Sequence, residues 1–227
     1  MEEKKGSKAL NFVVGTVVII LVIAGLVSII GSVAGKIGSS SKKSQNFEEY
    51  ESFISPVIMN DPNTFDDVSK ANPEQLIAIS VWSILQNNPE PDQYEYSDGD
   101  MLIPQKEVEQ SFKKLFGNDI KIVHTTVDGG GIEFKYSEKK KCYVIPITGI
   151  TPIYTPKVIR AEEKSGSVTL TVGYLASEDW VMDENGKMTQ PEPSKYMKVT
   201  LRSNSDGTYY ISALQSTDQT EIVTAKK

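Results

Sequence analysis

The sequence predicts an α+β domain that follows a single transmembrane helix, and three observations support this prediction. A long aliphatic run without charges lies near the N-terminus. Three segments with apolar residues at helical spacing follow it, and short alternating or β-branched runs separated by turn residues fill the rest of the chain. Helices followed by consecutive hairpins are typical of helices packed on one face of a curved antiparallel sheet.

The predicted transmembrane helix covers residues 9–35, which form a stretch of 27 residues without a charge. At 1.5 Å per residue, this stretch exceeds the hydrocarbon core of a bilayer, which is about 30 Å thick. Ser32-Val33-Ala34 would also suit a signal peptidase, but the apolar part of a signal peptide has only about 7–15 residues. We therefore expect an uncleaved, single-pass anchor that contacts the bilayer lipids.

Orientation is weakly determined, because residues 1–8 and residues 36–43 each contain three lysines. The short tail of residues 1–8 favours a cytoplasmic N-terminus and an extracytoplasmic C-terminal domain at the cell membrane. Within the span, Gly31 and Gly35 have the Gly-x-x-x-Gly spacing that lets two membrane helices approach closely. A homo-oligomer formed through these glycines is one expectation.

Residues 36–45 read as a flexible polar linker, residues 46–215 as one α+β domain, and residues 216–227 as a polar C-terminal tail. Residues 1–45 contain six Lys and two Glu, a charge of +4, so the remaining residues carry −10 of the total charge of −6. An acidic domain repels phosphate groups, which makes nucleic acid an unsuitable partner.

The helical part of the domain is predicted from spacing and capping signals. Apolar residues at helical intervals predict a helix over residues 46–58, and Asn72-Pro73-Glu74-Gln75 is a strong start for a second helix. A third helix is expected to start at Pro104 and to stop at Gly117. All three helices are predicted to precede the first clear strand.

The strand-rich part begins after Gly117. Strands are predicted over residues 120–127, 132–136, 142–147, 158–163, 168–175, 196–203 and 209–214. Ser165-Gly166 and Asp206-Gly207 are hairpin signals, so we expect an antiparallel sheet.

The order of these elements and the closing hairpin, whose last strand follows Asp206-Gly207 as Thr-Tyr-Tyr-Ile-Ser-Ala-Leu, resemble the cystatin-like roll of the nuclear transport factor 2 superfamily. The resemblance covers residues 46–215 and implies helices packed into the concave face of the sheet. The whole layout is also similar to uncharacterised anchored proteins of Gram-positive bacteria, and to the bitopic component of conjugation and type IV secretion systems.

No set of residues predicts catalysis. His124 is the only histidine, no Gly-x-Ser-x-Gly motif accompanies it, and we expect its neighbours in a strand to satisfy it. In an enzymatic roll, acidic or Tyr side chains would line the cone; the residues of this kind are Asp128, Tyr136, Tyr143 and Tyr174. Packing is the more ordinary role of such tyrosines. We therefore predict no enzyme activity.

Cofactor and metal sites are also not predicted. The single cysteine, Cys142, lies in an apolar run and reads as a buried, inert thiol. Residues 61–67 begin like a calcium loop but have Asp66 where glycine is required. Residues 129–131 are followed by a predicted strand instead of a helix, so they read as a hairpin and not as a phosphate loop. Residues 138–141 read as a solvated turn.

The loop of residues 176–195 is the candidate partner-binding segment. It contains Trp180, Val181 and Met182, and exposed residues of these types are common in protein contacts. It can equally fold onto the sheet as an extra hairpin. The expected function is thus a non-enzymatic binding or scaffold module that contacts a protein of the cell envelope. A structural subunit of a conjugation or secretion complex and a small-molecule-binding or enzymatic roll are the alternatives.

Overall fold

The computed structural model describes residues 41–87, 93–147, 152–184, 186 and 188–217. The predicted span, residues 9–35, with Gly31 and Gly35, lies outside these residues, as do residues 36–40 of the linker and residues 218–227 of the tail. Among the described helices, none has the length and apolar character needed to cross a membrane.

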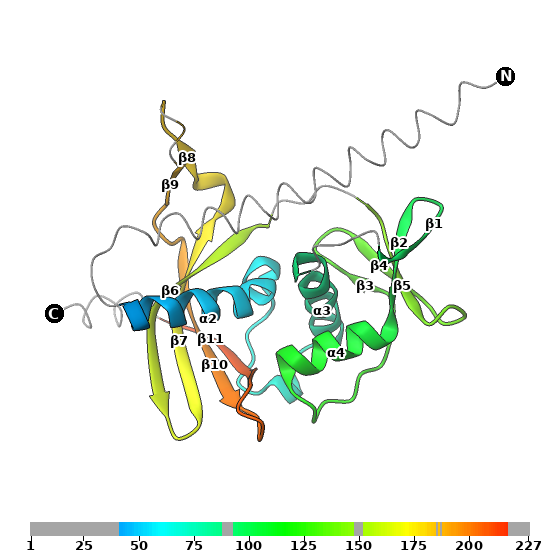
Figure 1. The fold of residues 1–227 in the computed structure, drawn as a ribbon, viewed down its shortest axis with the longest axis horizontal. Helices are drawn as coiled ribbons and strands as arrows, with labels where there is room; N and C mark the ends of the chain where they lie inside the picture. Colours follow the sequence, from blue (N-terminus) through cyan, green and yellow to red (C-terminus); the bar gives the residue numbers. More distant parts are fainter. Residues whose placement is uncertain (1–40, 88–92, 148–151, 185, 187, 218–227) are drawn as a thin grey trace.

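Helices lie between two antiparallel sheets (Figure 1). The helices are α2 (Ser41–Asn60), α3 (Pro73–Asn87) and α4 (Gln105–Phe116), with short 3-10 turns η1 (Val68–Lys70) and η3 (Ser177–Asp179). The strands are β1 (Glu95–Ser97), β2 (Asp100–Pro104), β3 (Val127–Asp128), β4 (Glu133–Ser137), β5 (Cys142–Ile145), β6 (Tyr154–Lys164), β7 (Ser167–Ala176), β8 (Val181–Met182), β9 (Met188–Thr189), β10 (Lys195–Ser203) and β11 (Tyr209–Ser216). The α+β class is therefore confirmed, although the strands divide between two main sheets where the sequence predicted one.

The first main sheet has the order β11-β10-β7-β6, and α2 packs on β6. Its inner face is made by alternate buried residues, as Val168, Leu170 and Val172 on β7 illustrate. Ser165 and Gly166 join β6 to β7 with φ values of 46° and 79°, the positive values that a tight mirror-image turn requires. The hairpins predicted at Ser165-Gly166 and at Asp206-Gly207 are both confirmed.

The second main sheet has the order β1-β2-β5-β4-β3, and α4 contacts both β2 of this sheet and β11 of the first. The hairpin β1–β2 precedes α4, so the prediction that three helices come before any strand was wrong. Its turn is Asp98-Gly99, with φ values of 57° and 95°. The flanking strands were missed because β1 and β2 have only three and five residues, and β2 is completed by pairing with the distant β5.

The strand predicted over residues 120–127 was also wrong, since only Val127 of this range lies in a described strand. Ile120 and Ile122 pack against the core from an irregular segment. The Thr126 side chain accepts a hydrogen bond from the Tyr136 backbone N–H at 3.0 Å. Side-chain contacts therefore hold this segment where a strand ladder was expected.

The helix signals were largely correct. Asn72 Oδ1 accepts a hydrogen bond from the Glu74 N–H at 2.9 Å, which caps α3 as predicted. Gly117, with φ of 85°, ends α4 as predicted. Three limits shift: α2 begins at Ser41 and ends at Asn60, and Pro104 belongs to β2, so that α4 starts one residue later.

Candidate functional site: an exposed hairpin and a charged groove

Within the loop of residues 176–195, β8 and β9 pair as a separate two-stranded hairpin, which projects away from the first main sheet (Figure 1). Val181 and Met182 lie on β8 with 63% and 64% of their surface exposed. Trp180 is only half-buried, and its indole N–H is shielded from solvent without a hydrogen-bond acceptor in the described part of the chain. Of the three residues singled out from the sequence, two aliphatic side chains thus face the solvent.

Acidic side chains flank the two exposed residues of β8. Glu178 and Asp179 precede Trp180, Asp183 and Glu184 follow Met182, and all four are exposed. The hairpin therefore presents a small apolar surface with an acidic rim.

The base of the hairpin is held firmly to the sheet. The Ser194 N–H and hydroxyl both donate to the Tyr174 carbonyl, at 2.9 Å and 3.1 Å. Lys195 forms an ion pair with Asp61 and places its ammonium 4.8 Å from the ring centre of Tyr174. A Cβ added to Gly173 would lie 2.7 Å from Pro193, so glycine allows this close approach. These contacts fix the direction in which the hairpin projects.

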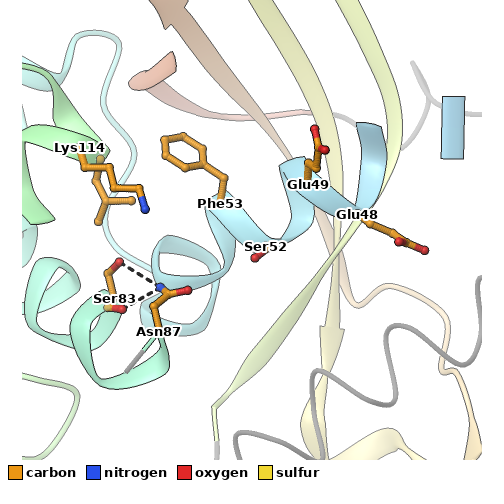
Figure 2. A pocket seen from close by; sticks show the side chains of 8 residues that line it. Glu48, Glu49, Ser52, Phe53, Ser83, Asn87 and Lys114 are labelled. Carbon is orange, nitrogen blue, oxygen red and sulfur yellow. Dashed lines mark hydrogen bonds between the residues drawn. The ribbon is translucent and has the colours of Figure 1, made fainter. Parts of the chain in front are cut away.

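A groove runs between α2, α4 and the turn that joins β10 to β11. One part, of about 720 Å³, is lined by Glu49, Tyr50, Phe53, Lys113, Lys114, Asn118, Glu163, Leu201, Asn204, Asp206, Thr208 and Tyr209. A second part, of about 490 Å³, reaches toward α3 and shares Glu49, Phe53 and Lys114 with the first. Figure 2 shows Phe53 and Lys114 approaching each other across this second part. We call the two parts together the α2–α4 groove.

The walls of the α2–α4 groove carry opposite charges. Glu49 lies on α2 and Glu163 at the end of β6, whereas Lys113 and Lys114 lie in the last turn of α4. None of these four exposed side chains forms an ion pair within 4 Å among the described residues. The groove thus displays carboxylates and ammonium groups that do not neutralise each other by contact.

His124 joins α4 to the second sheet. Its Nδ1 lies 3.0 Å from the Tyr143 hydroxyl, and its Nε2 lies 3.1 Å from Glu109 Oε1. Its ring stacks on Tyr136 with a centroid distance of 5.2 Å. The expectation of a histidine satisfied by its neighbours is confirmed, although it lies outside any strand.

Glu109, His124 and Tyr143 follow one another in the order of an acid–base relay. The Tyr143 hydroxyl, however, is buried and cannot contact a substrate. Tyr143 has no exposed surface, and burial raises the pKa of its phenol well above the usual value. A relay needs its terminal hydroxyl within reach of a substrate. The cluster therefore serves to hold the segment of residues 120–126 in place.

The four residues considered for an enzymatic cone are not all brought together, although the ring centres of Tyr136 and Tyr143 lie 5.2 Å apart. Tyr174 lies in the first sheet, whereas Asp128, Tyr136 and Tyr143 lie in the second. Asp128 accepts a hydrogen bond from the Gly131 N–H at 2.7 Å and so shapes the β3–β4 turn. Tyr136 donates its hydroxyl hydrogen to Gln105 at 2.6 Å. Each of these two groups is engaged in holding the fold.

The remaining motifs have structural roles. Gly129, Gly130 and Gly131 lie in the predicted hairpin, now β3–β4, and the Gly129 carbonyl accepts the indole N–H of Trp82 at 2.9 Å. Cys142 is buried, and burial raises the pKa of its thiol, as an inert cysteine requires. Lys141 and Glu138 pair at 2.8 Å in an exposed turn. In the part of the chain that the structure describes, no three His, Cys, Asp or Glu residues are placed to hold a metal ion.

Comparison with known proteins identifies no relative: no protein-family model, no curated protein and no solved structure matches the chain.

Proposed function

We propose that this protein is a non-enzymatic, membrane-anchored module that binds a partner protein of the cell envelope through the β8–β9 hairpin. The observation that carries the proposal is the exposure of Val181 and Met182, at 63% and 64%, on a hairpin that projects from the sheet. Exposed aliphatic side chains on a firmly held element are suited to bury themselves against a partner with little loss of conformational freedom.

The anchor and the orientation are parts of the same proposal. Residues 9–35 have the length and composition of a transmembrane helix. In this proposal the N-terminus lies in the cytoplasm. The hairpin would then lie outside the cytoplasm. The cystatin-like resemblance of residues 46–215 is part of the proposal, in which the roll serves as the scaffold for binding.

The test is affinity capture of the full-length protein from crosslinked native membranes, with mass spectrometry of the retained proteins. The wild type is compared with a double variant, Val181→Ser with Met182→Ser. The matched control is Val123→Ser, because Val123 is exposed to a similar extent, 64%, in the irregular segment that precedes β3.

We expect the wild type and the control to retain the same defined set of envelope proteins, and the hairpin variant to retain about tenfold less of it, as the loss of contact hot spots predicts. A secretion ATPase or channel protein within that set would assign the module to an export machine. Equal retention by all three proteins, or no retention above background, would contradict the proposal.

A further inference from the structure

We infer that the α2–α4 groove is a second binding site, and that it takes a small zwitterionic ligand of short-peptide size, with an ammonium group on the Glu49 side and a carboxylate on the Lys114 side. This inference is independent of the hairpin. It rests on the size of the groove, on its aromatic lining and on the separation of its charges.

The size suits a ligand of a few residues. The larger part of the groove has a volume of about 720 Å³, within the range of about 300–1,000 Å³ that small-molecule sites occupy. Its elements are a helix, a second helix and the end of a sheet, which are joined to one core. The site is therefore preformed between three separate elements.

The side of the groove next to α2 is suited to a cation. Tyr50, Phe53 and Tyr209 are half-buried there, so their rings line the groove while part of each remains open to it. Burial raises the pKa of the Tyr50 phenol, and the negative charges of Tyr209, Glu163 and Glu49 raise it further. Carboxylates beside aromatic rings form the environment that ammonium groups prefer.

The opposite side is suited to an anion. Lys113 and Lys114 are exposed on the last turn of α4 and both line the larger part of the groove. Lysine ammonium groups bind carboxylates as point charges, without a fixed angular demand. Because neither lysine is paired with Glu49 or Glu163 in the described structure, a ligand with both charges can satisfy the two sides together.

The probe is trialanine with free termini, and binding is measured by ligand-observed NMR on the full-length protein in lipid nanodiscs. Empty nanodiscs account for adsorption to lipid. Two blocked forms separate the charges: the C-terminal amide keeps only the ammonium, and the N-acetyl form keeps only the carboxylate. Phosphoethanolamine is tested as a further probe, because a lipid head group also carries an ammonium group and an anion.

We expect free trialanine to bind more tightly than either blocked form. Glu49→Gln should weaken binding of the C-terminal amide about two- to fivefold and leave the N-acetyl form unchanged, as loss of one exposed charge predicts. Lys114→Gln should do the reverse. Glu74→Gln on α3 and Lys106→Gln on α4 are the controls, since both are exposed charges outside the groove and should change neither probe.

All four substituted residues are exposed, so each variant should unfold at the same temperature as the wild type, which the thermal midpoint checks. Binding of phosphoethanolamine in preference to trialanine would overturn the peptide assignment. Equal binding of free trialanine and both blocked forms, no binding of any probe, or identical effects of Glu49→Gln and Lys114→Gln on both blocked forms would overturn the site itself.

Discussion

At the scale of single residues, Tyr143 and Tyr174 form an instructive pair. Both are wholly buried, one in each main sheet, and burial raises the pKa of both phenols. The Tyr143 hydroxyl lies 3.0 Å from His124 Nδ1, whereas the buried Tyr174 hydroxyl has no hydrogen-bond partner among the residues that the structure describes. The same side chain thus meets opposite conditions in the two sheets.

This difference predicts opposite effects of removing the hydroxyl. Tyr143→Phe should lower the free energy of unfolding by about 1 kcal/mol, because it leaves the His124 nitrogen without its partner. Tyr174→Phe should leave that free energy unchanged or raise it, because a buried hydroxyl without a partner destabilises the folded state. Urea unfolding of a fragment covering residues 41–217 measures both values. A larger loss for Tyr174→Phe would contradict this reading of the two environments.

At the scale of elements, Glu51 links α2 to β6. Its side chain has 1% of its surface exposed and accepts a hydrogen bond from the Val158 N–H at 2.8 Å, with the Lys157 ammonium 3.4 Å away. Burial raises the pKa of Glu51, and this effect exceeds the opposite effects of Lys157 and of the Val158 hydrogen bond. The helix is therefore joined to the sheet by a carboxyl group that ionises less readily in the folded state.

The raised pKa predicts a pH dependence of stability with a definite sign. Below the unfolded-state pKa, about 4.3, Glu51 is protonated in both states and its stabilising contribution is complete. As the pH rises through the folded-state pKa, this contribution is lost, because the unfolded chain releases the proton first. Relative to Glu51→Gln, the wild type should therefore lose stability as the pH rises.

The measurement is the free energy of unfolding of both proteins between pH 4 and pH 8, with Glu48→Gln as the control. Glu48 is exposed on the same helix, so its substitution should produce a much smaller change with pH. A wild type that gains stability relative to Glu51→Gln as the pH rises would show that the Lys157 pairing outweighs burial.

At the scale of the whole molecule, one apolar core extends from the first sheet to the second. It contains Val172 and Leu201 from the first sheet, Phe134 and Tyr143 from the second, and the inner faces of the three helices. The helices contribute apolar residues to both halves of this core. Loss of packing in one sheet would therefore expose helix residues that also support the other sheet.

We therefore predict that residues 41–217 unfold in one cooperative transition. Trp82 reports on the second sheet, because its indole donates to the Gly129 carbonyl and its ring meets Phe134 edge-on at 5.4 Å. In a Trp180→Phe variant, which removes the only other tryptophan, Trp82 fluorescence and far-UV circular dichroism should give the same urea midpoint. Two separate midpoints would show that the sheets unfold independently.

The local signals of the sequence were sufficient for several elements. The Asn72-Pro73 start, the Gly117 stop and the Ser165-Gly166 turn were predicted correctly, because capping and tight turns depend on residues adjacent in the chain. The sequence left open whether residues 176–195 form an exposed contact loop or a hairpin folded onto the sheet, and the structure has a hairpin that projects away from the sheet. The anchor of residues 9–35 remains a prediction from length and hydropathy.

Tertiary structure alone decided the features that depend on distant partners. The division into two sheets follows from the pairing of β2 with β5, and the irregular course of residues 120–126 follows from the contacts of His124 with Glu109 and Tyr143. The α2–α4 groove was missed for the same reason, since its charged walls come from two helices, α2 and α4, that are far apart in the chain. A sequence determines what a segment can do locally, but pairing, burial and free charge depend on which other segments the fold brings beside it.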